Sequence, residues 1–95
     1  MNHQEKMIDR QVGRNAELFA LKIGAIPTKA ERYGYIRILV AIIEQAHSEW
    51  NQTPQKPEQI GHLIHRMSKG QVDREEVKEI VELRDEERGY APKKN

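Results

Sequence analysis

The feature that most constrains this chain is a long apolar stretch that begins directly after a helix-capping signal. Thr28 and Glu31 have the S/T-x-x-E spacing of a capping box, and Pro27 precedes them. From there, large side chains recur every three or four residues, which places them on one face of an α-helix. They are Tyr33, Ile36, Leu39, Val40, Ile43, His47 and Trp50. We therefore expect one helix over residues 28–51, with this stripe facing the core.

A buried strand is the alternative for residues 36–43, where β-branched side chains are frequent. The periodicity argues against a strand because it continues through Ala46 to Trp50, and because a capping box has no role before a strand. Ile38 and Ile42 lie away from the main stripe, so this part of the helix is apolar around most of its circumference. A helix of that kind is usually buried on several sides. We therefore expect a second contact surface beside the core face.

Three other segments also have helical spacing. Residues 3–24 carry an apolar stripe with a period of three to four residues. Pro57 suits the first turn of a third helix, which Gly70 ends because glycine accepts the left-handed conformation beyond a helix. Asp73 and Glu76 form a second capping box, which predicts the start of a fourth helix.

These segments predict an all-α fold, a small four-helix domain in which the first two helices form a hairpin and the third and fourth pack across it. We expect one domain over residues 1–88 and a flexible tail over residues 89–95. The apolar fraction is 37% and the charged fraction is 33%, compared with roughly 45–50% and 25% in an average globular chain. Such a chain forms a thin core, and burial against a partner would stabilise it. We therefore expect self-association.

Composition and motifs argue against several kinds of chemistry. The sequence contains no cysteine, which excludes disulfides, thiolate metal sites and cysteine nucleophiles. The glycines are scattered singly, so the sequence has no phosphate-binding or dinucleotide-binding loop, and no serine or threonine lies in a nucleophile elbow. The amino-terminal residues are charged throughout, and no run approaches the roughly 20 apolar residues of a membrane span. We expect a cytoplasmic protein that is not an enzyme, needs no cofactor and does not bind a membrane.

The leading hypothesis for function is a small regulatory or adaptor protein that binds another protein and forms homo-oligomers. The second helix has more large apolar residues than a single face toward the core can bury, and the extra ones are Tyr35, Ile38 and Ile42. On the first helix, the apolar arc is widened by Leu18 and Leu21. We expect these residues to form the binding surface. The last helix is rich in Asp and Glu, which would attract a partner with a basic surface.

The first alternative is a nucleic-acid-associated regulator that contacts phosphates through basic residues of the first and third helices. These residues are Lys6, Arg10, Arg14, Lys22, Arg66 and Lys69. The third and fourth helices have the outline of a helix-turn-helix, but the acidic last helix is poorly suited to approach phosphates.

The second alternative is a metal-carboxylate helical bundle. Glu44 and His47 have the Glu-x-x-His spacing of carboxylate-bridged metal sites, although the chain contains only one copy. His62 and His65 lie about one turn apart on the polar side of the third helix, where they could ligate a metal. The simpler interpretation, which we favour, places His47 at the core edge near Trp50 and the other three residues on the surface.

Overall fold

The computed structural model describes residues 8–89, in which the regular elements are all helical. The elements are α1 (Arg14–Gly24), α2 (Lys29–Ala46), the short 3-10 helix η2 (Ser48–Gln52), α3 (Lys56–Met67) and α4 (Arg74–Glu87). The prediction of an all-α fold with four main helices is confirmed for this part of the chain.

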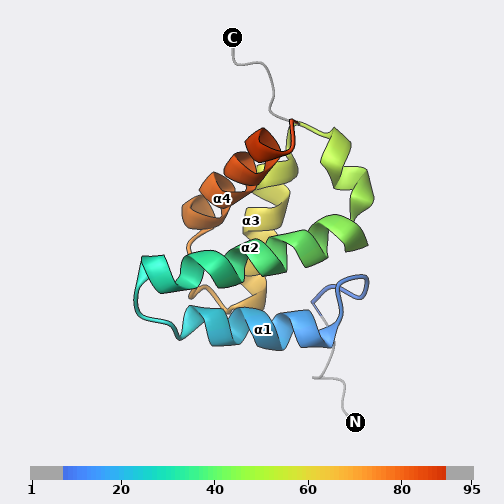
Figure 1. Cartoon of the computed structure of the whole chain (residues 1–95). Coiled ribbons are helices and arrows are strands. Elements are labelled where there is room, and N and C mark those ends of the chain that lie inside the picture. Colours follow the sequence, from blue (N-terminus) through green and yellow to red (C-terminus); the bar gives the residue numbers. More distant parts are fainter. Residues whose placement is uncertain (1–7, 90–95) are drawn as a thin grey trace.

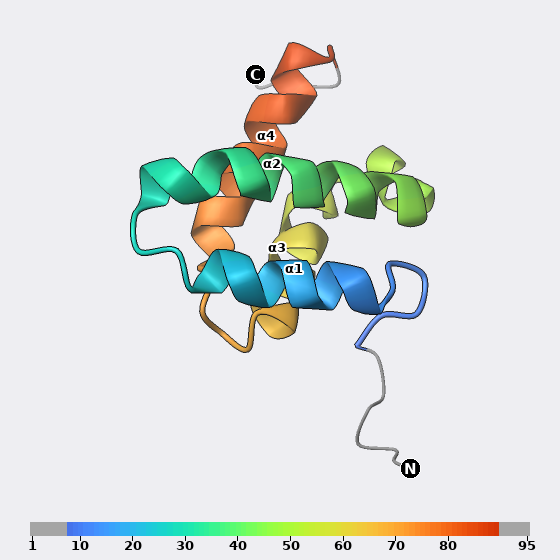
Figure 2. The same cartoon turned by 60° about the horizontal axis from the view of Figure 1, so that its bottom comes forward.

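The helices are arranged as two consecutive pairs. α1 and α2 lie side by side as a hairpin, and α3 and α4 pack closely against each other (Figure 1). The hairpin packs on the second pair, with α1 against α3 and α2 against α4 (Figure 2). The side of α2 that faces the reader in both views is not covered by another described helix.

The core forms between the two pairs, and all four main helices contribute to it. Its buried apolar residues are Ala16, Ala20, Ile23, Ile36, Leu39, Val40, Ile43, Ile60, Leu63, Ile64, Met67, Val72, Val77, Ile80 and Val81. On α2, the predicted core stripe is confirmed from Ile36 to Ile43. Tyr33 was also expected on that stripe, but it is exposed, and its ring lies under the guanidinium of Arg37 at 5.6 Å from the ring centroid.

The two predicted capping residues begin helices as expected. Thr28 Oγ1 accepts the backbone N–H of Glu31 at 3.2 Å, and Asp73 Oδ2 accepts the backbone N–H of Glu76 at 3.1 Å. The Glu76 carboxylate in turn accepts two hydrogen bonds from Arg32 of α2, at 2.9 and 3.1 Å. The start of α4 is therefore tied to α2 as well as capped.

The first helix begins at Arg14, so the predicted start near residue 3 is wrong for the described residues from 8 onward. Asp9 Oδ1 accepts the N–H of Val12 at 3.1 Å, and the N–H of Gly13 donates to the Asp9 carbonyl at 2.9 Å. Gly13 has a φ of 96°, a conformation that glycine adopts without steric cost. These bonds form a turn that apolar periodicity alone did not reveal.

The second helix ends at Ala46, so the prediction of one helix through residue 51 is also wrong. His47 leaves the helical conformation with φ −120° and ψ 62°, and η2 follows. The side chain of Asn51 donates to the Glu44 carbonyl at 3.5 Å, at the end of α2. Hydrogen bonds between side chain and backbone of this kind can replace helical ones where a helix ends.

The core orientation of α2 can be tested with two neighbouring residues. Ile43 is fully buried, whereas Ile42 is 40% exposed. Ile43→Asp should lower the free energy of unfolding by at least about 4 kcal/mol, because it buries an unpaired charge. Ile42→Asp should change it by no more than about 1 kcal/mol. Urea unfolding followed by circular dichroism measures both, and a stably folded Ile43→Asp variant would contradict the structure.

Candidate functional site

The outer face of α2 carries three large apolar side chains that the described chain leaves in solvent. Tyr35, Ile38 and Ile42 are 48%, 52% and 40% exposed. Their spacing of three and four residues places them on one side of the helix. We had expected this apolar circumference to be buried on several sides, and within this chain it is not. Tyr35, Ile38 and Ile42 are called the α2 outer face below.

A shallow hollow of about 420 Å³ lies along this face. Ile38 and Ile42 line it together with two small residues, Gly34 and Ala41. The remaining lining residues are Arg37, Gln45 and Arg84. The α2 outer face is therefore not a uniform ridge, since large side chains alternate with positions that have little or no side chain.

Contacts with α1 and α4 hold the two borders of this face. On the α1 side, the rings of Phe19 and Tyr35 meet edge to face at 89°, with their centroids 6.3 Å apart. On the α4 side, Arg37 donates two hydrogen bonds to Glu87, at 2.8 and 3.3 Å. The hydrogen bonds that Arg37 donates to Glu87, and to a lesser extent to Tyr33, raise its pKa. A surface whose borders are held in this way loses less conformational entropy when a partner binds.

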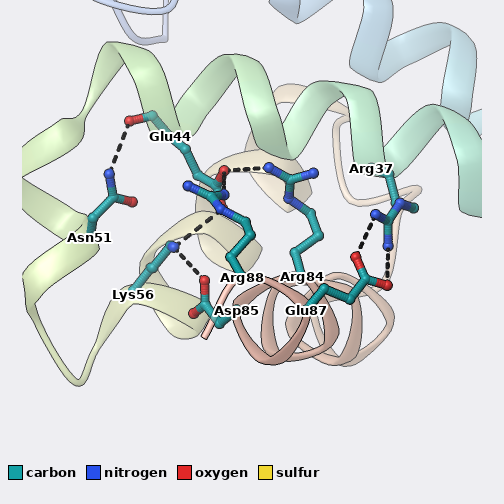
Figure 3. Close-up of polar contacts among 8 residues, drawn as sticks. All are labelled: Arg37, Glu44, Asn51, Lys56, Arg84, Asp85, Glu87 and Arg88. Atoms are coloured by element: carbon teal, nitrogen blue, oxygen red, sulfur yellow. Dashed lines mark hydrogen bonds and ion pairs between the residues drawn. The ribbon is translucent and has the colours of Figure 1, made fainter. Parts of the chain in front are cut away.

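A group of charged residues lies between α2, α3 and α4, close to this face, and three of its members, Glu44, Lys56 and Asp85, are buried (Figure 3). Glu44 Oε1 accepts hydrogen bonds of 2.6 Å from both Arg84 and Arg88. Lys56 Nζ lies 3.2 Å from Glu44 Oε2 and donates to Asp85 Oδ1 at 2.6 Å. Burial by itself would raise the pKa of Glu44, but the hydrogen bonds from the three cations outweigh it and lower that pKa. We call these five residues the Glu44 cluster.

Glu44 does not lie where the sequence pattern predicted it, since we expected it to face solvent and it is only 5% exposed. A signal was available, because Ile36, Val40 and Glu44 succeed one another at intervals of four residues on the core side of the helix. Arg84 and Arg88 show the same spacing on α4. Periodicity restricted to apolar residues overlooks a charged residue in the core stripe.

His47 occupies a second buried polar position, at the junction of α2 and η2. Its ring stacks on Trp50 with centroids 4.0 Å apart, which confirms the predicted place at the core edge. Nε2 lies 2.7 Å from Asp9 Oδ2, and Nδ1 lies 3.1 Å from Glu49 Oε2. Burial lowers the pKa of His47, but hydrogen bonds and charges from Glu49 and Asp9 outweigh this and raise it.

The structure does not bring the predicted metal ligands together. Within residues 8–89, no group of three or more His, Cys, Asp or Glu side chains is placed to hold a metal ion. Glu44 binds the cations of α4 and α3, whereas His47 contacts Asp9 and Glu49. His65 Nδ1 lies 2.9 Å from the Val72 carbonyl in the α3–α4 loop.

The basic residues of the nucleic-acid alternative occupy separate segments. Lys6 lies outside the described residues. Arg10 lies in the turn before α1, whereas Arg14 is the first residue of α1 and lies 3.7 Å from Glu17. Lys22 lies in the last turn of α1, while Arg66 and Lys69 lie at the end of α3 and in the loop that follows.

The remaining predicted partner-binding residues lie on α1. Leu18 is 43% exposed, and Leu21 is half-buried. Leu18 and the ring of Phe19 point in directions about 100° apart, because consecutive helical residues are rotated by that angle. The contact between Phe19 and Tyr35 therefore does not by itself make Leu18 continuous with the α2 outer face.

Comparisons with protein-family models, with curated proteins and with solved structures found no match. Among the described helices, none has the length and apolar character needed to cross a membrane. The class of protein is therefore defined by the fold alone: a small all-helical protein with an exposed apolar helix face.

From the contacts in the Glu44 cluster, we predict that the free energy of unfolding depends strongly on the charge of Lys56. Lys56→Met should lower the free energy of unfolding by about 3–5 kcal/mol, because it leaves the Asp85 carboxylate buried without its cation. The double variant Lys56→Met with Asp85→Leu should recover part of this loss, since the unpaired charge is then removed. Urea unfolding measures both, and a single variant as stable as the parent would contradict the assigned pairing.

From the raised pKa of His47, we predict that the stability of the fold decreases as the pH rises through that pKa. Its folded pKa lies above the unfolded value of about 6.5. Protonation of His47 therefore stabilises the fold fully below that pH, and this contribution is lost as the pH rises through the folded pKa. Urea unfolding at a series of pH values should show the fall. His47→Gln should reduce it, whereas His62→Gln, a change at an exposed histidine, should not. An unchanged pH dependence in His47→Gln would refute the assignment.

Proposed function

We propose that this protein is a non-enzymatic regulatory or adaptor protein that acts by binding another protein through the α2 outer face. The observation that carries the proposal is the exposure of Tyr35, Ile38 and Ile42 along one side of a single helix. Fully burying a large apolar side chain contributes about 1.5–3 kcal/mol, so covering three half-exposed ones gives a partner a useful free energy of binding. An apolar stripe on one helix is a common element of helix-mediated recognition.

The charges around this face also support binding through apolar contact. Arg37 and Arg84, which line the hollow, are already paired with Glu87 and Glu44. A partner that covers the hollow therefore meets no uncompensated charge at these two positions, and the desolvation penalty is reduced. On α4, ion pairs also engage Glu76, Asp85 and Glu87, so the acidic surface is smaller than the sequence suggested. Steering of a basic partner is therefore a secondary element of the proposal.

Photo-crosslinking tests this proposal even when the partner is unidentified. A photoreactive benzoylphenylalanine replaces Ile42, and the labelled chain is irradiated in an extract of its native source with added unlabelled chain. We expect a covalent adduct. If the adduct is with another protein, excess unlabelled parent chain abolishes it by competition. If the adduct is with the added chain, its yield rises with the concentration of that chain until the labelled chain is saturated.

Two variants used as competitors give the control. Ile38→Lys introduces a charge on the α2 outer face. As the unlabelled chain, it should be at least about tenfold less effective than the parent, both in competing for another protein and in forming the adduct itself. Leu83→Lys introduces the same charge at an exposed apolar residue on α4 and should behave as the parent does in both cases. Equal competition by Ile38→Lys and the parent, or no protein adduct at all, would refute the proposed binding surface.

A further inference from the structure

We infer that the partner on the α2 outer face is a second copy of this chain, with the two α2 helices antiparallel and crossing at Ile38. This inference rests on the proposed function, and it adds the identity and orientation of the partner. Three observations support it. They are the position of Gly34 in α2, which contacts within the chain do not explain, the order of large and small residues around Ile38, and the distribution of charge along the helix.

Gly34 differs from the other glycines within the described helices. A Cβ added at Gly24 would lie 2.6 Å from Gln71 Cβ, and one added at Gly61 would lie 3.1 Å from the Arg74 carbonyl oxygen. Close packing inside the chain therefore accounts for glycine at both positions. A Cβ at Gly34 would meet no described atom within 4 Å, and Gly34 has no left-handed backbone angle. Glycine is among the least favourable residues within a helix, and contacts within the described chain give no reason for it at this position.

Large and small residues alternate about Ile38 in a self-complementary order. When two copies of one helix pack antiparallel around a twofold axis, each residue faces the one equally distant from the axis on the other side. With the axis at Ile38, Gly34 of one copy faces Ile42 of the other, and Tyr35 faces Ala41. Each large side chain is thus placed opposite a residue with little or no side chain. Ridges and grooves of this kind allow two helices to approach closely.

The charges along the helix favour the antiparallel orientation. The five residues of this pairing, Gly34, Tyr35, Ile38, Ala41 and Ile42, carry no formal charge. Beyond them, the antiparallel arrangement places the exposed carboxylate of Glu31 opposite Gln45, whose amide can donate a hydrogen bond. A parallel arrangement would place Glu31 opposite its own copy, and like charges repel.

The size of this surface predicts a weak dimer. The segment between Glu31 and Gln45 is about 21 Å long at 1.5 Å per residue, and only one side of it is available. A contact along one helix covers less than the roughly 800 Å² per partner of a stable complex. We therefore expect a dissociation constant in the micromolar range or weaker, with dimer formed at high concentration.

Sedimentation equilibrium from about 1 µM to about 1 mM measures this association. Gly34→Leu should weaken dimerisation at least about tenfold, because leucine occupies the space that Ile42 of the other copy requires. The same variant should be at least as stable as the parent at low concentration, since leucine favours helix more than glycine. Leu83→Lys is the control and should dimerise like the parent. A chain that stays monomeric throughout, or a Gly34→Leu variant that dimerises like the parent, would overturn the inference.

Disulfide cross-linking tests the orientation, and the absence of cysteine from the sequence makes single cysteine variants unambiguous. Under mild oxidation, Ile38→Cys should form a covalent dimer with itself. Gly34→Cys and Ile42→Cys should cross-link in a mixture of the two variants, and far less when each is alone. Leu83→Cys is the control and should not cross-link. Efficient cross-links of Gly34→Cys and of Ile42→Cys each with itself would indicate a parallel dimer and overturn the inference.

The two proposals fail in different ways. A monomeric chain whose position-42 adduct forms with a different protein overturns the second copy as partner and leaves the binding surface standing. Competition by Ile38→Lys equal to that of the parent refutes the binding surface itself, and the inference fails with it.

Discussion

The pairing of Glu44 with cations from two other helices is the interaction on which the arrangement of this protein depends. Glu44 lies on α2, while Lys56 begins α3 and both Arg84 and Arg88 lie at the end of α4 (Figure 3). A buried carboxylate without partners costs several kcal/mol, so packing arrangements that separate these helices are strongly disfavoured. Lys56 also binds Asp85, and it is one of the most buried side chains in the described chain. These charges therefore restrict the orientation of α4 relative to α2 more tightly than apolar contacts, which have little directional preference.

That orientation explains why one side of α2 stays in solvent. The inner side of the helix contacts the core and the Glu44 cluster, and α1 and α4 border it on either flank. No described element lies over the remaining side, where Ile38 is the most exposed of the large apolar residues. Of the six large apolar residues that are exposed in the described chain, three lie together on this side of α2, and the proposed binding would cover them.

The proposed binding surface depends on this rigidity. Phe19 fixes Tyr35 from the α1 side, and the Arg37–Glu87 pair connects α2 to α4. Contacts of this kind reduce the conformational entropy that side chains on the borders would lose when a partner binds. The proposed pairing of Gly34 with Ile42 across a twofold axis uses the same property, since a helix that bends or shifts would lose the match between large and small residues.

Much of the fold follows from local sequence signals. The helix starts at Thr28 and Asp73, the core side of α2 and the glycine at the end of α3 were all predictable, because each depends on residues within a few positions of one another. The sequence shows that Tyr35, Ile38 and Ile42 lie beyond the residues that one core face needs, but their exposure was not predicted, since a helix of this kind was expected to be buried on several sides. The sequence could not show whether that excess would be covered by another helix of the same chain.

The tertiary structure decided the features that depend on residues far apart in the sequence. α1 starts at Arg14 and α2 ends at Ala46, at two turns that meet through Asp9 and His47, which are separated by 38 positions. Glu44 becomes buried because Arg84, 40 positions later, reaches it. Helical propensity and apolar periodicity describe only residues that are close in the sequence. The free energy of a contact between distant residues depends on how whole helices pack. By itself, the sequence therefore determined the helices and their inner faces, and the packing decided where they end and which face remains in solvent.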